Sequence, residues 1–252
     1  MDYGGLTMKE IITFNPMESD KVLLPIQYNH MVQAMIYKLL DEEMADFLHE
    51  KGFQNEKRTF KMFTFSRITG RYTLDRNNGL ITFDGPIKLT ISSHYDEFSN
   101  SIGNSFLKRQ KVQLGNNHLE VKQLAVENEN VNSKEIKIHT LSPISVYSTL
   151  YRKDGRKFTY YFNPKEEEFE EIIENNLKNK YKAFYSEEPP EGKVEIKPLG
   201  PTRLSVVNYK GFIIKGYTGK FAMKGAPDLL QLGVDTGLGS KNSQGFGCVK
   251  LI

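Results

Sequence analysis

The 252-residue sequence predicts an α+β fold, and two kinds of periodicity along the chain lead to this prediction. Apolar residues recur at helical spacing in a few segments, and short strand-like runs bounded by turn residues surround each of them. A chain of this length can form one large domain or two of ordinary size. The polar stretch 127–134 (ENENVNSK) is the best candidate for a boundary. We therefore expect two domains, 8–128 and 135–252.

In the first of these, a strand is expected to begin at Met8. Residues 1–7 (MDYGGLT) are either an expression remnant or an alternative start, and both interpretations stay open. The segment 30–40 has helical spacing, and Asn29 is available as its N-cap. Further helices are expected at Asp41–Glu50 and Asp96–Leu107. Strand-like runs occur at Thr59–Ile68, Leu80–Phe83, Lys88–Ser92 and His118–Val126.

The second half contains the clearest helix of the chain, Lys165–Phe184. Phe169, Ile173 and Leu177 share one face, while glutamates in the first turns and lysines in the last match the helix dipole. A short helix is expected at Pro227–Leu232, and the turn 153–156 is typical of a hairpin tip. The expected strands are Glu135–Leu141, Ile144–Tyr151, Val194–Lys197, Arg203–Asn208, Phe212–Phe221 and Phe246–Ile252.

Composition excludes several classes of protein. No run of 18 apolar residues occurs, so we expect no membrane span and a cytoplasmic location. The single cysteine, Cys248, excludes an internal disulfide and cysteine-cluster metal sites. The five histidines, at positions 30, 49, 94, 118 and 139, have none of the usual metal-ligand spacings. The sequence therefore predicts neither a metal site nor a cofactor.

The net charge of +3 is unevenly distributed. The stretch Lys165–Glu174 contains six glutamates and one lysine, a local charge of −5, which leaves +8 on the remaining residues. A basic remainder of this kind can hold a polyanion such as nucleic acid. A solvated surface with one acidic helix explains the same charges equally well.

The glycine-rich end of the chain is its most informative segment. Five glycines fall within the 15 residues 233–247, which end in GLGSKNSQGFG. Glycine allows positive φ and close approach of another backbone, so such a loop is suited to hold phosphates through its own N–H groups. It is not a nucleotide P-loop, because Lys241 is followed by Asn242 and has no glycine before it.

This segment resembles the glycine-rich signature of the RAMP superfamily of RNA-binding proteins. The similarity is greatest to the CRISPR-associated endoribonucleases that cut repeat RNA into guide units. Further landmarks occur in order at 25–30, 36–37, 47–50, 61–66 and 141–144, so the resemblance covers nearly the whole chain. It implies tandem ferredoxin-like (RRM-like) domains with antiparallel sheets, each a β-α-β-β-α-β unit.

The resemblance also implies a metal-independent endoribonuclease that cleaves CRISPR repeat RNA. Attack by the 2′-OH would leave a 2′,3′-cyclic phosphate and a 5′-OH. Carried over to this sequence, the family's acid or base is His49, its tyrosine is Tyr37 and its lysine is Lys61, with Lys51 and Lys57 left open as alternatives. A surface histidine and a boundary aromatic are the plainer interpretations of the first two.

Helical geometry supports a rim position for both rings. Tyr37 lies about 60° beyond Leu40, at the edge of the apolar stripe, and His49 follows the inward pair Phe47–Leu48. RNA contacts are expected from the glycine-rich end and from basic residues after the proposed catalytic segment. These residues are Gly237, Gly239, Lys241, Asn242, Ser243, Gly245, Gly247, Arg58, Arg67 and Arg71.

Two other functions stay open at this point. One is a non-catalytic RNA-binding scaffold in a CRISPR interference complex, and the other is a small-molecule phosphotransferase that uses the glycine loop with magnesium. The expected partner is the repeat transcript. Attachment to an effector complex and formation of a homodimer are also left open.

Overall fold

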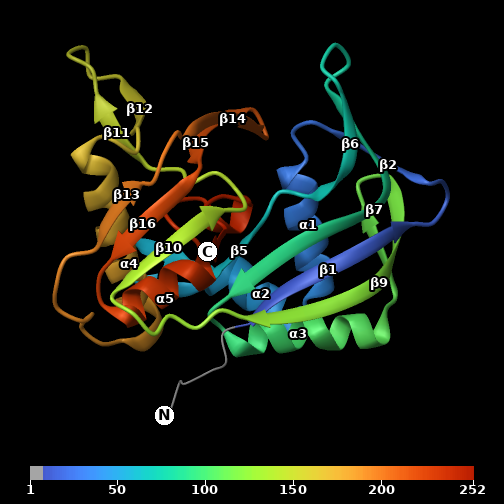
Figure 1. Ribbon diagram of the computed structural model, residues 1–252, viewed down its shortest axis with the longest axis horizontal. Helices are drawn as coiled ribbons and strands as arrows, with labels where there is room; N and C mark the ends of the chain where they lie inside the picture. The colour runs from blue at the N-terminus through green and yellow to red at the C-terminus, as the bar shows by residue number, and fades with distance from the viewer. Residues whose placement is uncertain (1–7) are drawn as a thin grey trace.

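The computed structural model describes residues 8–252, and these form two halves that lie side by side (Figure 1). Residues 1–7, for which the sequence left two interpretations open, lie outside the described residues. The elements of the first half are β1 (Met8–Pro16), β2 (Lys21–Pro25), α1 (Asn29–Leu39), α2 (Glu42–Asp46), the π-helix η1 (Phe47–Lys51), β3 (Phe53–Asn55), β4 (Arg58–Phe60), β5 (Phe63–Phe65), β6 (Thr69–Asp75), β7 (Leu80–Ser93), α3 (Asp96–Lys108), β8 (Lys111–Leu114) and β9 (Asn117–Asn128).

The second half follows after a short irregular connection. Its elements are β10 (Glu135–Thr140), β11 (Tyr147–Tyr151), β12 (Lys157–Tyr161), α4 (Glu167–Tyr185), β13 (Glu195–Pro198), β14 (Arg203–Tyr209), β15 (Phe212–Thr218), β16 (Lys220–Lys224), α5 (Pro227–Thr236), the 3-10 helix η2 (Asn242–Gln244) and β17 (Val249–Leu251).

The two main sheets have the same topology. In the first half β5 and β1 pair with opposite edges of β7, and β1 also pairs with β9, which gives the order β5-β7-β1-β9. In the second half the order is β13-β16-β10-β17. Each sheet is antiparallel and is built from a β-α-β-β-α-β chain order, which is the ferredoxin-like unit. The predicted α+β fold with tandem ferredoxin-like units is confirmed.

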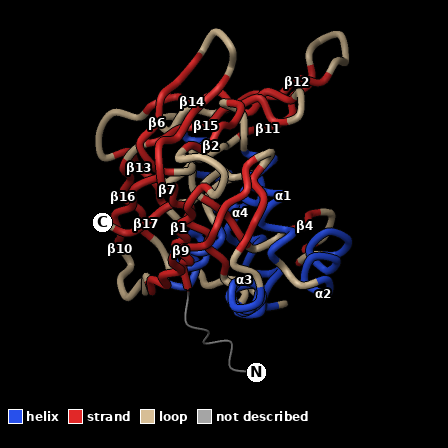
Figure 2. Tube along the Cα trace, turned by 90° about the vertical axis from the view of Figure 1, so that its right-hand side faces the viewer, coloured by secondary structure: helices blue, strands red, loops and turns tan. Residues whose placement is uncertain are grey.

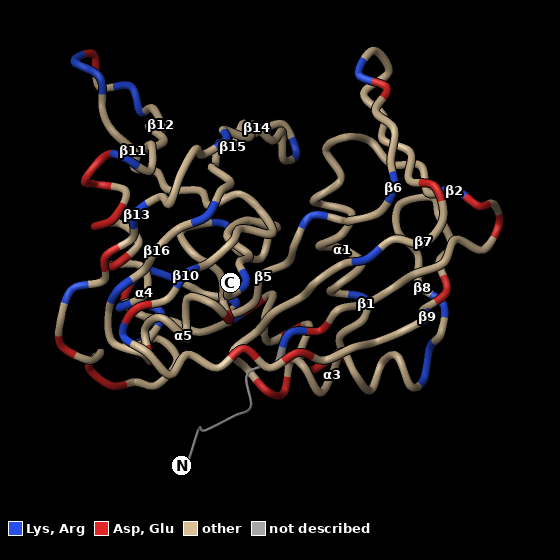
Figure 3. The backbone as a smooth tube through the Cα atoms, viewed as in Figure 1, with Lys and Arg blue, Asp and Glu red and all other residues tan. Residues whose placement is uncertain are grey.

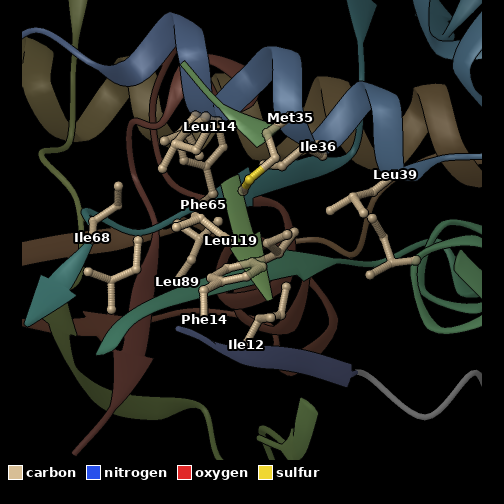
Figure 4. Close-up of a cluster of buried hydrophobic side chains, with 14 of the residues drawn as sticks. Ile12, Phe14, Met35, Ile36, Leu39, Phe65, Ile68, Leu89, Leu114 and Leu119 are labelled. Carbon is tan, nitrogen blue, oxygen red and sulfur yellow. The ribbon is translucent and has the colours of Figure 1, made fainter. Parts of the chain in front are cut away.

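Each half has its own apolar core. In the first, Ile12 and Phe14 of β1 pack with Met35 and Ile36 of α1, whose helical stripe is buried as the periodicity predicts (Figure 4). The helices of this half lie on one side of its sheet (Figure 2). The second core contains residues between 131 and 249 and shares none with the first. On this basis we propose 8–128 and 135–252 as the two domains.

Several local predictions were wrong in detail. The helix expected over 41–50 is a short α-helix followed by the π-helix η1. The strand expected over 59–68 is interrupted, because Met62 adopts φ 53° and ends β-pairing there. The runs 80–83 and 88–92 are one strand, β7. Asn29 does not cap α1; its side chain is buried and bonds the C-terminal loop instead, since a buried amide needs a partner.

A buried polar cluster joins the halves. His94 comes just after β7. Its Nδ1 lies 2.8 Å from Asp235 Oδ2 of α5, and its Nε2 lies 2.6 Å from the Tyr185 hydroxyl of α4. Gln231 donates to the other oxygen of Asp235. Burial raises the pKa of the Asp235 carboxyl, and the His94 contact opposes that rise. The carboxylate is therefore accommodated only because both halves supply its partners.

No helix within residues 8–252 combines the length and the apolar character needed to cross a membrane.

We predict that His94→Leu lowers the free energy of unfolding by about 3–5 kcal/mol, because it leaves the Asp235 carboxylate buried without its main partner. The matched control is His118→Leu, which removes an exposed histidine–Glu18 pair and should cost less than about 1 kcal/mol. Urea unfolding of both variants measures the difference. Equal destabilisation of the two would show that the buried cluster does not hold the halves together.

Candidate nucleic-acid interface

The glycine-rich loop after α5 is held between the two halves by donors from the first half. Asn29 Nδ2 donates to the carbonyl of Gln244 at 2.9 Å, and Gln33 Nε2 donates to that of Ser243 at 2.7 Å. Thr64 Oγ1 of β5 donates to the carbonyl of Phe246 at 2.9 Å. Because its carbonyls face inward to these donors, the loop turns other backbone groups outward.

Gly245 lets the loop approach β5 closely. Its φ is +82°, and a Cβ at this position would collide with the Phe65 ring and lie 2.8 Å from Asn29 Nδ2. Any larger residue would push the loop off the first half. The glycine is therefore required by the contact between the halves as well as by the turn.

A cavity of about 460 Å³ opens between this loop, the β4–β5 segment and α4. Among the described residues that line it, four carry positive charge and none carries negative charge. Its lining residues are Arg58, Thr59, Phe60, Lys61, Met62, Phe63, Tyr147, Ile172, Asn176, Lys180, Thr236, Gly239, Ser240, Lys241, Asn242, Ser243 and Gln244. The acidic start of α4 lies at the outer edge of the second half, away from the first half (Figure 3).

Three consecutive residues of the loop, Lys241, Asn242 and Ser243, line this cavity. Lys241 adopts the left-handed conformation (φ 65°, ψ 28°) just before the 3-10 helix η2. In the described part of the chain, the N–H groups of Lys241, Asn242 and Ser243 have no hydrogen-bond partner. Successive N–H groups in such a turn form an anion-binding nest. Lys241 Nζ also lies 5.9 Å above the Tyr147 ring. These features suit a phosphate with an aromatic ring beside it.

One short segment, residues 61–63, contains Lys61 and contacts the other two predicted catalytic residues. Lys61 Nζ donates to the backbone carbonyl of Leu48 and, at 3.2 Å, to that of His49. Phe63, two residues further on, packs edge-on against Tyr37 with ring centres 6.0 Å apart. The segment 61–63 lines the cavity and contacts both the backbone at His49 and the ring of Tyr37, but Tyr37 itself is not among the lining residues.

The side chains of Tyr37, Lys61 and His49 differ in how deeply they are buried. Burial raises the pKa of the Tyr37 hydroxyl to about 12, with a smaller contribution from nearby Tyr209, so this phenol keeps its proton at neutral pH. Burial lowers the pKa of the Lys61 ammonium. The His49 side chain is 79% exposed, lies 3.7 Å from the Glu50 carboxylate and does not line the cavity.

The cavity brings together only part of the predicted RNA-binding set. Arg58, Gly239, Lys241, Asn242 and Ser243 line it. Gly237, Gly245 and Gly247 are buried within the loop and support its shape. Arg67 and Arg71 do not line it; Arg71 is exposed on β6, opposite Asp84 of β7. Lys51 and Lys57 also lie outside the lining, unlike Lys61.

The residues that line the cavity but were absent from the predicted set include Tyr147, Asn176 and Lys180. A signal for one of them was present. Lys180 continues the apolar stripe of Phe169, Ile173 and Leu177 at helical spacing, so a lysine falls on the buried face of α4. Tyr147 and Asn176 come from separate elements, and no sequence pattern connects them to the loop. Within residues 8–252, no group of three or more His, Cys, Asp or Glu side chains is placed to hold a metal ion.

Known proteins are similar to this chain in both sequence and fold. Residues 126–251 match the family described as CRISPR associated protein Cas6, C-terminal. The chain is 31% identical over 228 residues to the CRISPR-associated endoribonuclease Cas6 1 of Methanocaldococcus jannaschii, covering 90% of this chain and 87% of that protein. It is 30% identical over 252 residues to the CRISPR-associated endoribonuclease Cas6 of Pyrococcus furiosus, covering 97% of this chain and 90% of that protein. A solved structure of a Cas6-related protein from Pyrococcus furiosus shares the fold, with a TM-score of 0.84, 21% identity and 98% of each chain covered.

We predict that Gly245→Ala is much more destabilising than Gly155→Ala. Both glycines have positive φ (+82° and +79°), but a Cβ at Gly155, at the β11–β12 tip, has nothing within 4 Å. Gly155→Ala should cost about 1–2 kcal/mol for backbone strain alone. Gly245→Ala should cost roughly 1–3 kcal/mol more, because the loop must move off Phe65. Urea unfolding compares the two, and equal costs would contradict the close-approach explanation.

Proposed function

Because the chain belongs to the Cas6 family of CRISPR-associated endoribonucleases, we propose that it cleaves CRISPR repeat RNA without a metal ion, at the cavity beside the glycine-rich loop. The observation that supports this site is the combination of four positive side chains and three unpartnered backbone donors next to the segment that carries Lys61. This surface is suited to hold the RNA backbone while leaving the bases free.

The proposed reaction uses the nucleophile that RNA itself carries. The 2′-oxygen attacks the adjacent phosphorus as its proton passes to a base, and the bond from phosphorus to the 5′-oxygen breaks as that oxygen receives a proton. The products are a 2′,3′-cyclic phosphate and a 5′-OH. The protein must supply a base, an acid, positive charge for the pentavalent transition state and a fixed in-line geometry.

Three residues are proposed for these roles. Histidine as a residue type exchanges protons near neutral pH, so His49 is assigned proton transfer. Its exposed ring is free to turn toward a bound strand. Tyr37 keeps its proton because burial raises its pKa to about 12, so it is assigned as a donor to the phosphate. Lys61 is assigned as the cation for the developing charge, and the bond from its Nζ to the His49 carbonyl positions that histidine's backbone.

The exposure of His49 outside the cavity favours a second candidate, a non-catalytic RNA-binding scaffold of a CRISPR interference complex. A scaffold would use the same cations and backbone donors but would leave bound RNA intact. The two candidates therefore differ in whether RNA is cut and not in whether it is bound.

We predict that His49→Ala slows cleavage of repeat RNA by roughly two to four orders of magnitude, the usual effect of losing a general acid or base. RNA affinity should change little, because the ring contributes no fixed contact to the cavity. Single-turnover cleavage and filter binding separate the two quantities. His118→Ala, on the exposed face of β9, is the control and should cut at the normal rate. Normal cleavage by His49→Ala would remove this residue from the mechanism.

The reaction class is tested with two labelled repeat RNAs in EDTA, one all-ribose and one with 2′-deoxy at the scissile nucleotide. We expect the all-ribose RNA to be cut and to end in a cyclic phosphate, and the deoxy RNA to be bound but not cut. Cleavage that stops in EDTA and returns with magnesium would contradict the metal-independent mechanism. Binding of both RNAs with cleavage of neither would establish the scaffold.

A further inference from the structure

Lys180 is a fully buried ammonium group beneath the glycine-rich loop. Its residue is 2% exposed, and its Nζ lies 2.7 Å from the carbonyl of Gly237, 2.9 Å from Asn242 Oδ1 and 3.0 Å from Thr236 Oγ1. A weaker contact of 3.4 Å reaches the Thr236 carbonyl. All four acceptors are uncharged oxygens, so the positive charge is solvated by dipoles and is not cancelled by a carboxylate.

The bonding pattern excludes direct proton transfer by Lys180. An ammonium group has three N–H donors, and the three short contacts already use them. Lys180 has no donor left for a substrate. Its influence on a bound molecule must pass through the loop that it holds and through its charge.

The loop contacts give Lys180 a positioning role. Asn242, which accepts from Lys180, donates through Nδ2 to the carbonyls of Leu238 and Phe246, at 3.2 Å and 3.0 Å, and so closes the loop on itself. The same Nδ2 would lie 2.8 Å from a Cβ at Gly237, which leaves room there only for glycine. Lys180 thus anchors the amide around which the loop folds.

The charge is tolerated for a local reason. The carbonyls of Thr236 and Gly237 end α5, and the C-terminal end of a helix is where a cation is stabilised. Burial still lowers the pKa of Lys180 to about 7. A lysine with that pKa changes its charge in the range where nucleic-acid enzymes work.

We propose that Lys180 is a positioning residue whose positive charge lies beneath the phosphate-binding surface of the loop, so that RNA binding and the protonation of Lys180 favour each other. This inference rests on the proposed RNA-binding function of the cavity. The other charged or titratable groups that line the cavity with Lys180 are Arg58 and Lys61 on the β4–β5 segment, Tyr147 on β11 and Lys241 on the loop, and Asp235 on α5 comes directly before Thr236, which accepts from Lys180. Three of these five are cations, but it is burial that lowers the pKa of Lys180, and a phosphate bound in the cavity would raise that pKa by attracting the ammonium charge.

The sign of the coupling follows from this arrangement. Below pH 7 Lys180 carries its proton whether or not RNA is bound. As the pH rises above 7, the free protein loses that charge, while bound phosphate holds the proton in place. RNA affinity should therefore decrease as the pH rises from 7 to 8.5, and binding at pH 7.5 should be accompanied by uptake of less than one proton per protein.

The test uses Lys180→Met, which keeps the volume of the side chain and removes its charge. The probe is repeat RNA with 2′-deoxy at the scissile nucleotide, whose affinity is measured between pH 6 and 8.5 and at several salt concentrations. We expect about tenfold weaker binding below pH 7, a shallower pH dependence and a smaller salt slope, by about one. The control Thr236→Val loses one acceptor but keeps the ammonium, so it should retain the pH dependence.

Calorimetry of the wild-type protein in two buffers with different ionisation enthalpies measures proton uptake without any variant, so the test holds even if Lys180→Met does not fold. Wild-type binding without proton uptake overturns the inference. A folded Lys180→Met protein with wild-type affinity and pH profile also overturns the inference. The proposed function stands in either case if the wild type binds and cuts the all-ribose RNA. A wild type that binds no RNA overturns both.

Discussion

The insertion of the glycine-rich loop between the two halves is the constraint on which the cavity depends. Asn29, Gln33 and Thr64 donate to carbonyls of residues 243–246, so the loop is attached to the first half although it belongs to the second. Residues 241–243 of the loop line the cavity, and among the described residues their N–H groups have no hydrogen-bond partner. Without that attachment the cations of β4–β5 and the donors of the loop would not face the same space.

Polar groups buried at and near this junction fix how the halves meet. The pair His94–Asp235 crosses this junction, whereas the ammonium of Lys180 is bonded within the second half and holds the loop in place there. Buried ionic groups add little net stability compared with apolar residues, but they strongly disfavour arrangements in which they lose their partners. Such groups suit a site that must keep two ferredoxin-like units in one relative position.

The candidate site combines a rigid part and a more accessible part. The loop, Lys180 and Asn242 are cross-linked by hydrogen bonds, whereas His49 is exposed in the middle of the π-helix η1. A π-helical turn often marks a functional position, because the extra residue changes where the side chains point. A loop held by hydrogen bonds and an exposed imidazole outside the cavity are consistent with the proposal that a bound strand completes the site.

The helices and strands with strong periodicity were predictable, because burial of one face dictates the spacing of apolar residues; α1, α3 and α4 all lie within a few residues of their expected bounds. The glycine-rich segment and the set His49, Tyr37 and Lys61 could also be identified along the chain. The duplicated topology followed from the family resemblance and not from periodicity, and the burial of Asn29 and Lys180 and the absence of Arg71 from the cavity could not be predicted. These features depend on contacts between residues far apart in the sequence, such as Lys180 with Asn242 or His94 with Asp235. Local periodicity indicates which face of an element is buried, but it does not indicate what that face packs against.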